Sequence, residues 1–178
     1  MTMQTATLQA MQNQVELFEA TIRDHRQSLA RIVATYERIP AMQQELHQEI
    51  LLAIWKALGN FNGESSIHTF IYRVAHNQAI SHVSKYARKH RHENLETAMV
   101  DDASDPMQHV VQSQRVNRLF NAMHRLPLLQ RELLSLSLEG LSYKELAEVT
   151  GMSESNVGVR LNRAKKALKS IMESDYGR

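Results

Sequence analysis

The stretch LSYKELAEVTGMSESNVGVRLNRAKK, residues 141–166, decides the fold. Ser142 and Glu145 have the Ser-x-x-Glu spacing of a capping box, which predicts that a helix begins there. Gly151 stands where a tight turn between two helices needs a positive φ, and Ser153 can cap the helix that follows. This order is typical of a helix-turn-helix, whose second helix enters the DNA major groove with its N-terminal end first.

The apolar positions of the second helix separate a core face from a DNA-facing side. Val157 and Leu161 are expected to face the core, so the opposite side is predicted to contact DNA. Arginine can pair with guanine and asparagine with adenine, whereas further cations contact phosphates. A close approach to DNA would also account for Gly158 within a helix. The expected DNA contacts are Ser153, Ser155, Asn156, Val159, Arg160, Arg163, Lys165 and Lys166. The alternative is a three-helix bundle that only packs or binds protein.

Helical spacing of apolar residues continues through most of the chain. One stripe runs from Val15 to Tyr36, a second from Leu46 to Leu58 behind Pro40, and a third starts at Ile67. No segment shows the sustained period-two alternation of strands. The sequence therefore predicts an all-α fold.

An acidic stretch without a clear stripe divides the chain. Residues 93–104 carry most of an acidic run, and Asp105-Pro106 with Gln108 has the pattern of a helix start. We therefore expect two small helical domains joined by an acidic linker. The expected parts are an N-terminal tail (1–11), a first domain (12–92), a linker (93–107) and a second domain (108–176).

Charge is arranged in blocks along the chain. Residues 65–92 contain no carboxylate, residues 93–114 contain no Lys or Arg, and a second basic block follows in residues 155–172. Two cationic surfaces on either side of an anionic connector suit a polyanion held at two places. Solvated helix faces carrying blocks of charge are the alternative explanation.

Composition narrows the class of protein. The 178 residues include no Cys, and no apolar run approaches the roughly 20 residues of a membrane span. The N-terminal residues have neither the basic nor the apolar region of an export signal, so we expect a cytoplasmic protein without membrane insertion. No nucleophile elbow, P-loop or HExxH motif is present, and the His residues are accompanied by no Cys and by no carboxylates at ligand spacing. We expect no enzyme activity, no cofactor and no metal site.

Two segments in this order resemble extracytoplasmic-function (ECF) sigma factors of bacterial RNA polymerase. They are EILLAIWKALGNFNGESSIHTFIYRVAHNQAISHVSK and, after the acidic stretch, LPLLQRELLSLSLEGLSYKELAEVTGMSESNVGVRLNRAKKAL. The resemblance implies two helical domains, called regions 2 and 4, and a role in promoter-specific transcription initiation without catalysis. It implies core RNA polymerase, promoter DNA and an anti-sigma factor as partners.

The resemblance also implies a polymerase-binding helix over residues 42–55. The family's Asp-Ala-Glu-Asp-Leu-x-Gln-Glu motif corresponds to MQQELHQE here, which is less acidic because Met42, Gln43 and Gln44 depart from it. Trp55 matches an aromatic family position, and we expect it to pack in the core. The implied polymerase contacts are Glu45, Leu46, Gln48, Glu49 and Leu52.

The segment NFNGESS resembles the family's loop that captures a base flipped from the promoter minus-ten element. Extruding a base costs a few kcal/mol, so a prepared pocket has to compensate for the lost stacking. Arg73, Asn77 and Lys85 follow at helical spacing and predict a cationic track for one strand. The implied minus-ten contacts are Asn60, Phe61, Asn62, Gly63, Glu64, Ser65, Arg73, His76, Asn77, Lys85, Tyr86, Arg88 and Lys89.

Two other interpretations differ in class from a sigma factor. One is a stand-alone helix-turn-helix regulator, which would bind a palindromic duplex as a dimer and has no need of the NFNGESS loop. The other is a sigma-like protein-interaction module, suggested by the weakened MQQELHQE motif. Reconstituted transcription with core polymerase separates all three.

Overall fold

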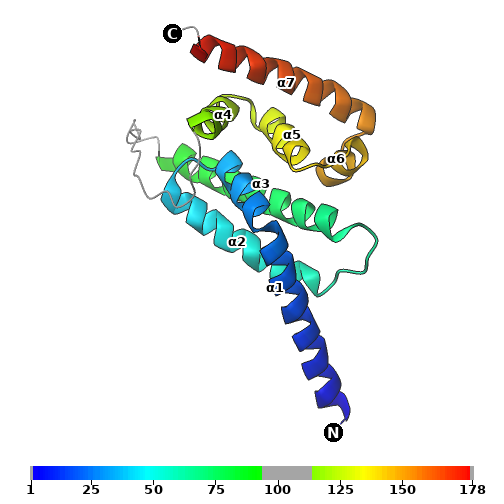
Figure 1. Cartoon of the computed structure of the whole chain (residues 1–178). Coiled ribbons are helices and arrows are strands. Elements are labelled where there is room, and N and C mark those ends of the chain that lie inside the picture. The colour runs from blue at the N-terminus through cyan, green and yellow to red at the C-terminus, as the bar shows by residue number, and fades with distance from the viewer. Residues whose placement is uncertain (1, 94–113, 177–178) are drawn as a thin grey trace.

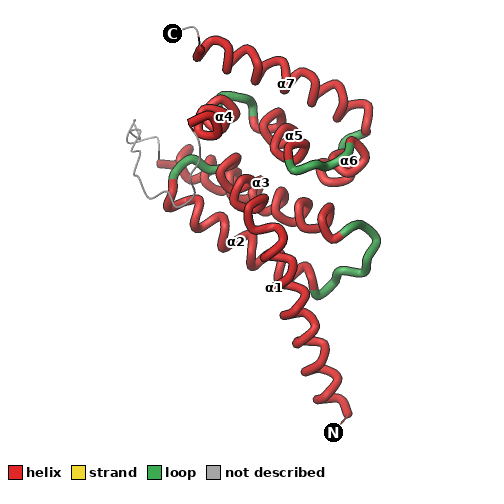
Figure 2. The backbone as a smooth tube through the Cα atoms, in the orientation of Figure 1, coloured by secondary structure: helices red, strands yellow, loops and turns green. Residues whose placement is uncertain are grey.

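The computed structural model describes residues 2–93 and 114–176, and within them it contains seven α-helices and no strand. The helices form two groups, and the second group lies over the first (Figure 1, Figure 2). Their bounds are α1 (Thr2–Tyr36), α2 (Pro40–Leu58), α3 (Ile67–Glu93), α4 (Gln114–His124), α5 (Leu128–Leu138), α6 (Tyr143–Thr150) and α7 (Glu154–Tyr176). The all-α prediction is confirmed. None of the described helices is both long and apolar enough to cross a membrane.

The first group, α1 to α3, is organised around the apolar stripes. Leu29, Ile50, Ile54 and Ile71 are fully buried, so the helices contact one another through the faces that periodicity predicts. Trp55 packs edge-on against Phe18, with ring centroids 5.4 Å apart, but it is only half-buried, so it lies at the edge of the core rather than inside it as expected. α1 is helical from Thr2, and its N-terminal part extends beyond the other helices (Figure 1).

The second group, α4 to α7, buries apolar residues that belong to the same cluster as those of the first group. Leu133, Leu146, Leu161 and Ala164 are fully buried between α5, α6 and α7. The expected helix start at Asp105-Pro106, like most of the linker, lies outside the described residues. The second group begins in the structure at α4.

The two groups share an interface that the sequence did not indicate. The Arg31 guanidinium donates to both Glu139 carboxylate oxygens at 2.7 Å. The Thr35 and Ser135 hydroxyls lie 3.2 Å apart in a buried contact. His124 Nε2 lies 2.8 Å from the Ala34 carbonyl oxygen. These bonds join α1 to α4, α5 and the turn after α5, so the second domain is held against the first by polar contacts.

Glu132 on α5 is a buried acid, with only 5% of its surface exposed. Burial raises its pKa to about 7, and the neighbouring Arg131 only partly opposes this effect. The folded state thus favours the neutral form of Glu132. The contribution of this group to the stability of the protein is lost as the pH rises from about 4.5 to about 7.

Glu132→Gln should remove this pH dependence, because glutamine is neutral throughout. The unchanged chain should lose stability between pH 5 and pH 8, and the variant should not. The difference in unfolding free energy between them should therefore shift in favour of the variant by on the order of 2 kcal/mol over this range. Urea denaturation followed by circular dichroism at both pH values measures this difference. If the stability difference between the two proteins is the same at both pH values, Glu132 is not buried as a neutral carboxyl.

Candidate nucleic-acid and polymerase interfaces

The helix-turn-helix is built from local signals that the structure confirms. The Ser142 hydroxyl accepts from the Glu145 backbone N–H, and the Glu145 carboxylate accepts from the Ser142 N–H at 2.8 Å. Hydrogen bonds from Ser142 and Thr69 lower the pKa of Glu145 to about 2, so this cap is ionised near neutrality. Gly151 has a φ of 69°, and the Ser153 hydroxyl accepts from the Asn156 N–H. The capping box, the left-handed glycine and the second cap fix the angle between α6 and α7.

The side of α7 opposite its core face is open. Val157 and Leu161 are fully buried, as predicted. The Nε of Arg160 donates to the Asn156 side-chain oxygen at 2.8 Å, so the two predicted base-reading side chains orient each other. The predicted DNA contacts are all exposed: Ser153, Ser155, Asn156, Val159, Arg160, Arg163, Lys165 and Lys166. We call this set the reading face.

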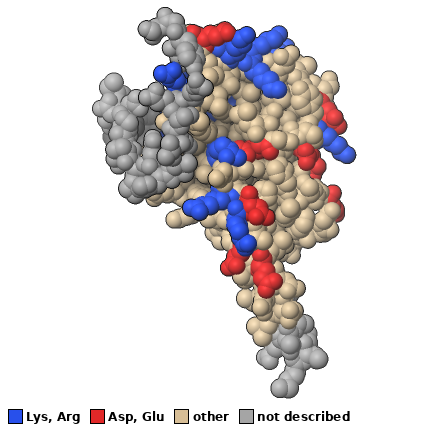
Figure 3. All heavy atoms as spheres, in the orientation of Figure 1, with Lys and Arg blue, Asp and Glu red and all other residues tan. Residues whose placement is uncertain are grey.

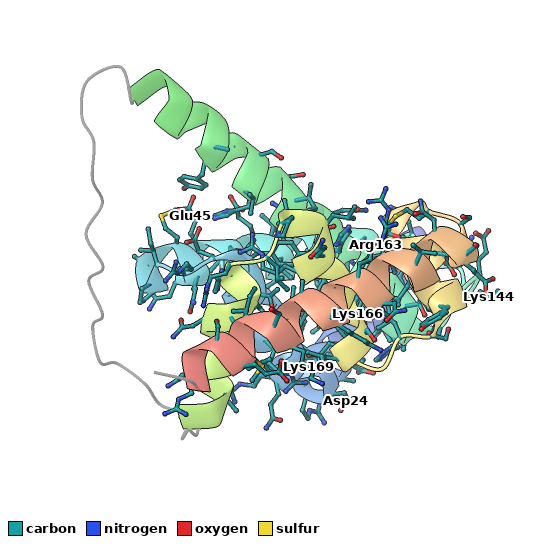
Figure 4. All side chains as sticks on the ribbon, turned by 90° about the horizontal axis from the view of Figure 1, so that it is seen from above. Asp24, Glu45, Lys144, Arg163, Lys166 and Lys169 are labelled. Atoms are coloured by element: carbon teal, nitrogen blue, oxygen red, sulfur yellow. The ribbon has the colours of Figure 1, made fainter. Side chains whose placement is uncertain are left out.

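Cations gather over this helix. Lys and Arg side chains lie along the upper edge of the molecule, over α7 (Figure 3). In the view from above, Arg163, Lys166 and Lys169 follow one another along α7, and Lys144 lies near its N-terminal end (Figure 4). Such a row suits phosphates flanking the contacted bases.

Gly158 has room for a small side chain within the protein. A Cβ at this position would lie 3.4 Å from Cε2 of Tyr143, which projects from the first turn of α6, and this is an ordinary van der Waals distance. The packing of α6 on α7 therefore does not by itself require a glycine here. The expectation that a close approach to DNA accounts for Gly158 stays a prediction.

The loop between α2 and α3 contains the NFNGESS segment and is tied by its own side chains. Gly63 has a φ of 78°, and Asn62 Nδ2 donates to Glu64 Oε1 at 2.7 Å. The ring of Phe61 lies 4.8 Å from that of Phe70, so both rings pack against the core. The exposed members of this segment are Asn60, Asn62, Gly63, Glu64 and Ser66, whereas Ser65 is half-buried.

The predicted strand track on α3 is only partly open. Asn77 and Lys85 are exposed, and Arg73 is half-buried. His76 is 6% exposed and lies with Nδ1 2.9 Å from the buried Tyr36 hydroxyl. This corrects the prediction that His76 contacts DNA, because its ring lies in the interior. The side chains of Arg88 and Lys89 lie outside the described residues.

Only some of the predicted polymerase contacts lie on the exposed face of α2. Gln48 is exposed and Leu52 is 53% exposed. Leu46 is fully buried in the core with Ile50 and Ile54. This corrects the prediction that Leu46 contacts the polymerase. Its i, i+4 spacing with Ile50 and Ile54 predicts the burial that the structure shows.

Glu45 and Glu49 connect α2 to α3. Tyr86 donates to Glu45 at 2.7 Å, and that bond raises the pKa of Tyr86 to about 12. The buried His82 lies with Nδ1 2.9 Å from Glu49, which Gln78 also contacts. Burial alone would raise the pKa of Glu49, but the bonds from His82 and Gln78 outweigh it and lower the pKa. Both implied polymerase contacts, Glu45 and Glu49, thus form hydrogen bonds with side chains of α3. The partner of Glu45 is Tyr86, which is itself an implied DNA contact.

Comparison with known proteins accounts for this arrangement. Residues 21–89 match the family model "Sigma-70 region 2", and residues 117–168 match "Sigma-70, region 4". The RNA polymerase sigma-H factor of Pseudomonas aeruginosa is 24% identical over 168 residues, covering 88% of this chain and 86% of that protein. The ECF RNA polymerase sigma-E factor of Haemophilus influenzae is 25% identical, covering 71% of this chain and 72% of that protein.

Solved structures share the fold. The sigma factor RpoE of Bartonella quintana, crystallised with the anti-sigma factor NepR, matches with a TM-score of 0.74 and 20% identity, over 89% of this chain and 98% of that one. CnrH in complex with the cytosolic domain of CnrY matches with a TM-score of 0.67 and 21% identity, over 94% and 95%.

A region 2 domain followed by a region 4 helix-turn-helix defines a transcription initiation factor rather than an enzyme. The chain belongs to the sigma-70 family, as an RNA polymerase sigma factor of the ECF type, whose members bind core RNA polymerase and promoter DNA.

Proposed function

We propose that this sigma factor divides its contacts between its two domains. Residues 12–92 bind core polymerase through the outer face of α2 and hold the melted minus-ten strand. Residues 108–176 bind the minus-thirty-five duplex. The observation that carries the proposal is the exposed reading face at the start and along the length of α7, because its eight members are all exposed while Val157 and Leu161 are fully buried in the core.

The minus-thirty-five contact uses two kinds of interaction. Asn156 and Arg160 have the donors and acceptors that recognise base edges in the major groove. Arg163, Lys165 and Lys166 neutralise phosphates, which fixes the register of the helix without reading sequence. Because Asn156 already orients Arg160, little side-chain freedom is lost when the pair meets a base.

The minus-ten contact uses the loop and the open side of α3. Asn60, Asn62 and Glu64 offer exposed hydrogen-bonding groups around the tight turn at Gly63. Asn77 and Lys85 continue the surface along α3 and suit the backbone of a single strand. Strand opening then uses binding energy alone, because the protein binds the unpaired strand better than the duplex.

Asn77→Ala tests the strand contact. The variant should initiate less well on a double-stranded promoter, and a template with a pre-melted bubble should relieve the defect, because the bubble supplies the open strand. Run-off transcription with core polymerase on both templates measures this. Asn121→Ala is the matched control, since Asn121 is an exposed asparagine on α4 and is not among the predicted DNA or polymerase contacts. Equal defects on both templates would contradict a role of Asn77 in opening.

We also propose that the protein works in the cytoplasm, where it meets core polymerase, and that an anti-sigma factor controls it. The support for an anti-sigma partner is that the two solved structures described above are complexes, one of them named as containing an anti-sigma factor. Co-purification of this chain from its own cells, followed by identification of stoichiometric partners, tests this part of the proposal.

A further inference from the structure

α6 lies against the N-terminal part of α3, where the strand track begins. The Thr69 hydroxyl donates to Glu145 Oε1 at 2.8 Å. One turn further along α3, Arg73 Nη1 donates to Glu148 Oε1 at 3.2 Å. Two carboxylates of the helix-turn-helix thus occupy the first two turns of the helix that is proposed to hold the minus-ten strand.

These carboxylates contact the part of α3 along which the proposed minus-ten strand would pass. Arg73 is the first cation along α3 after the NFNGESS loop, so a strand that runs from the loop toward Lys85 passes its guanidinium. A carboxylate and a phosphate are both anionic acceptors for the same arginine donors. Glu148 and a DNA phosphate therefore compete for Arg73.

Other contacts hold α6 in this position. The bidentate pair of Arg31 with Glu139 lies at the turn before α6, and Glu139 keeps only 4% of its side chain exposed. The Thr35–Ser135 contact fixes α5 on α1. In the same arrangement the reading face of α7 stays exposed. The duplex-reading surface is open, while Arg73 at the start of the strand track is paired with Glu148 and keeps 37% of its side chain exposed.

We propose that the sigma factor, before it meets polymerase, uses α6 as an internal competitor of the minus-ten strand. Glu148 on Arg73 and Glu145 on Thr69 block the strand until the second domain moves off the first, whereas minus-thirty-five duplex binding does not require this movement. The inference rests on the proposed function, because it takes α3 as the strand site.

A reversible disulfide tests this inference. The chain has no cysteine, so Thr35→Cys with Ser135→Cys introduces the one possible pair, at a position where the native oxygens are 3.2 Å apart. The oxidised protein should bind minus-thirty-five duplex like the reduced protein. It should fail to bind a fluorescent single-stranded minus-ten oligonucleotide and fail to open promoters with core polymerase. Reduction should restore both.

The reduced protein shows whether a negative result contradicts the proposed function or only the internal competition. If reduced protein does not initiate with core polymerase, although the unmodified chain does, the paired substitution itself is harmful, and the next variant decides. If neither initiates, the proposed function fails. If the oxidised protein opens promoters as well as the reduced one, the internal competition is contradicted while the proposed function stands.

Glu148→Gln tests the internal competition a second time, without the disulfide. Removing the charge should raise the affinity of the free chain for the minus-ten oligonucleotide about two- to fivefold, the effect expected of a half-exposed ion pair. Glu173→Gln is the control, because Glu173 pairs with Lys169 on its own helix, α7, rather than with α3. Unchanged oligonucleotide affinity in Glu148→Gln, or an equal rise in Glu173→Gln, would overturn the inference.

Discussion

Leu46→Ala should lower the free energy of unfolding by about 2–5 kcal/mol, the range for removing a buried leucine from a packed core. Leu46 is fully buried with Ile50 and Ile54, in the layer that α1 and α3 close. Because a native domain is only marginally stable, a loss of this size unfolds a substantial fraction of the protein. Chemical denaturation followed by circular dichroism measures the change.

Leu52→Ala is the matched control for this prediction. Leu52 lies on the same helix as Leu46 and undergoes the same chemical change, but it is 53% exposed. Leu52→Ala should change the unfolding free energy by only about 0.5 kcal/mol or less, as surface substitutions do. It should instead weaken polymerase binding in a pull-down with purified core enzyme. Equal destabilisation by both variants would contradict the assignment of Leu46 to the core and Leu52 to the surface.

Arg160→Ala should weaken binding to the preferred minus-thirty-five duplex by about 1–3 kcal/mol, or roughly 5- to 150-fold. Arg160 is exposed on the reading face and is held by Asn156, so its removal takes away a base contact and leaves the fold of α7 intact. The preferred duplex is first selected from a random library with the unchanged protein. Binding to that duplex and to a scrambled one is then compared by fluorescence anisotropy.

Lys166→Ala separates base reading from phosphate contact. This variant should lose affinity about equally on the selected and the scrambled duplex, because a phosphate contact carries no sequence information. Arg160→Ala should lose much more on the selected one. Equal losses on the two duplexes in Arg160→Ala would show that Arg160 contacts phosphate only.

Local signals allowed much of the second domain to be predicted. The capping box at Ser142, the positive φ at Gly151 and the core face of Val157 and Leu161 depend on residues close together in the sequence. Each of these features is set by hydrogen bonds or side-chain positions within one or two turns. Sequence spacing alone therefore indicates them correctly.

The errors in the first domain came from transferring roles by motif. Leu46 falls within the family's polymerase-binding motif, but it also begins the i, i+4 stripe that continues to Ile50 and Ile54. His76 has polar chemistry, but it follows the buried Tyr72 by four residues and precedes the buried Ala79 by three. In both cases the periodicity of the helix predicted burial, and the residue type suggested a surface role.

The interface between the domains could not be predicted from spacing. Arg31 and Glu139 are separated by 108 positions, and Arg73 and Glu148 by 75. Each of these side chains is a charged residue on a helix or turn that looks solvated by itself. Only the packing of the second domain on the first brings these pairs together.

The most direct measurement is promoter opening by purified core polymerase with and without this chain. With the chain present, transcripts should begin at defined positions on its promoters, and thymines around the start should become reactive to permanganate. Core polymerase alone should give neither result. Transcripts without defined start sites, together with unreactive thymines in the presence of the chain, would contradict the account.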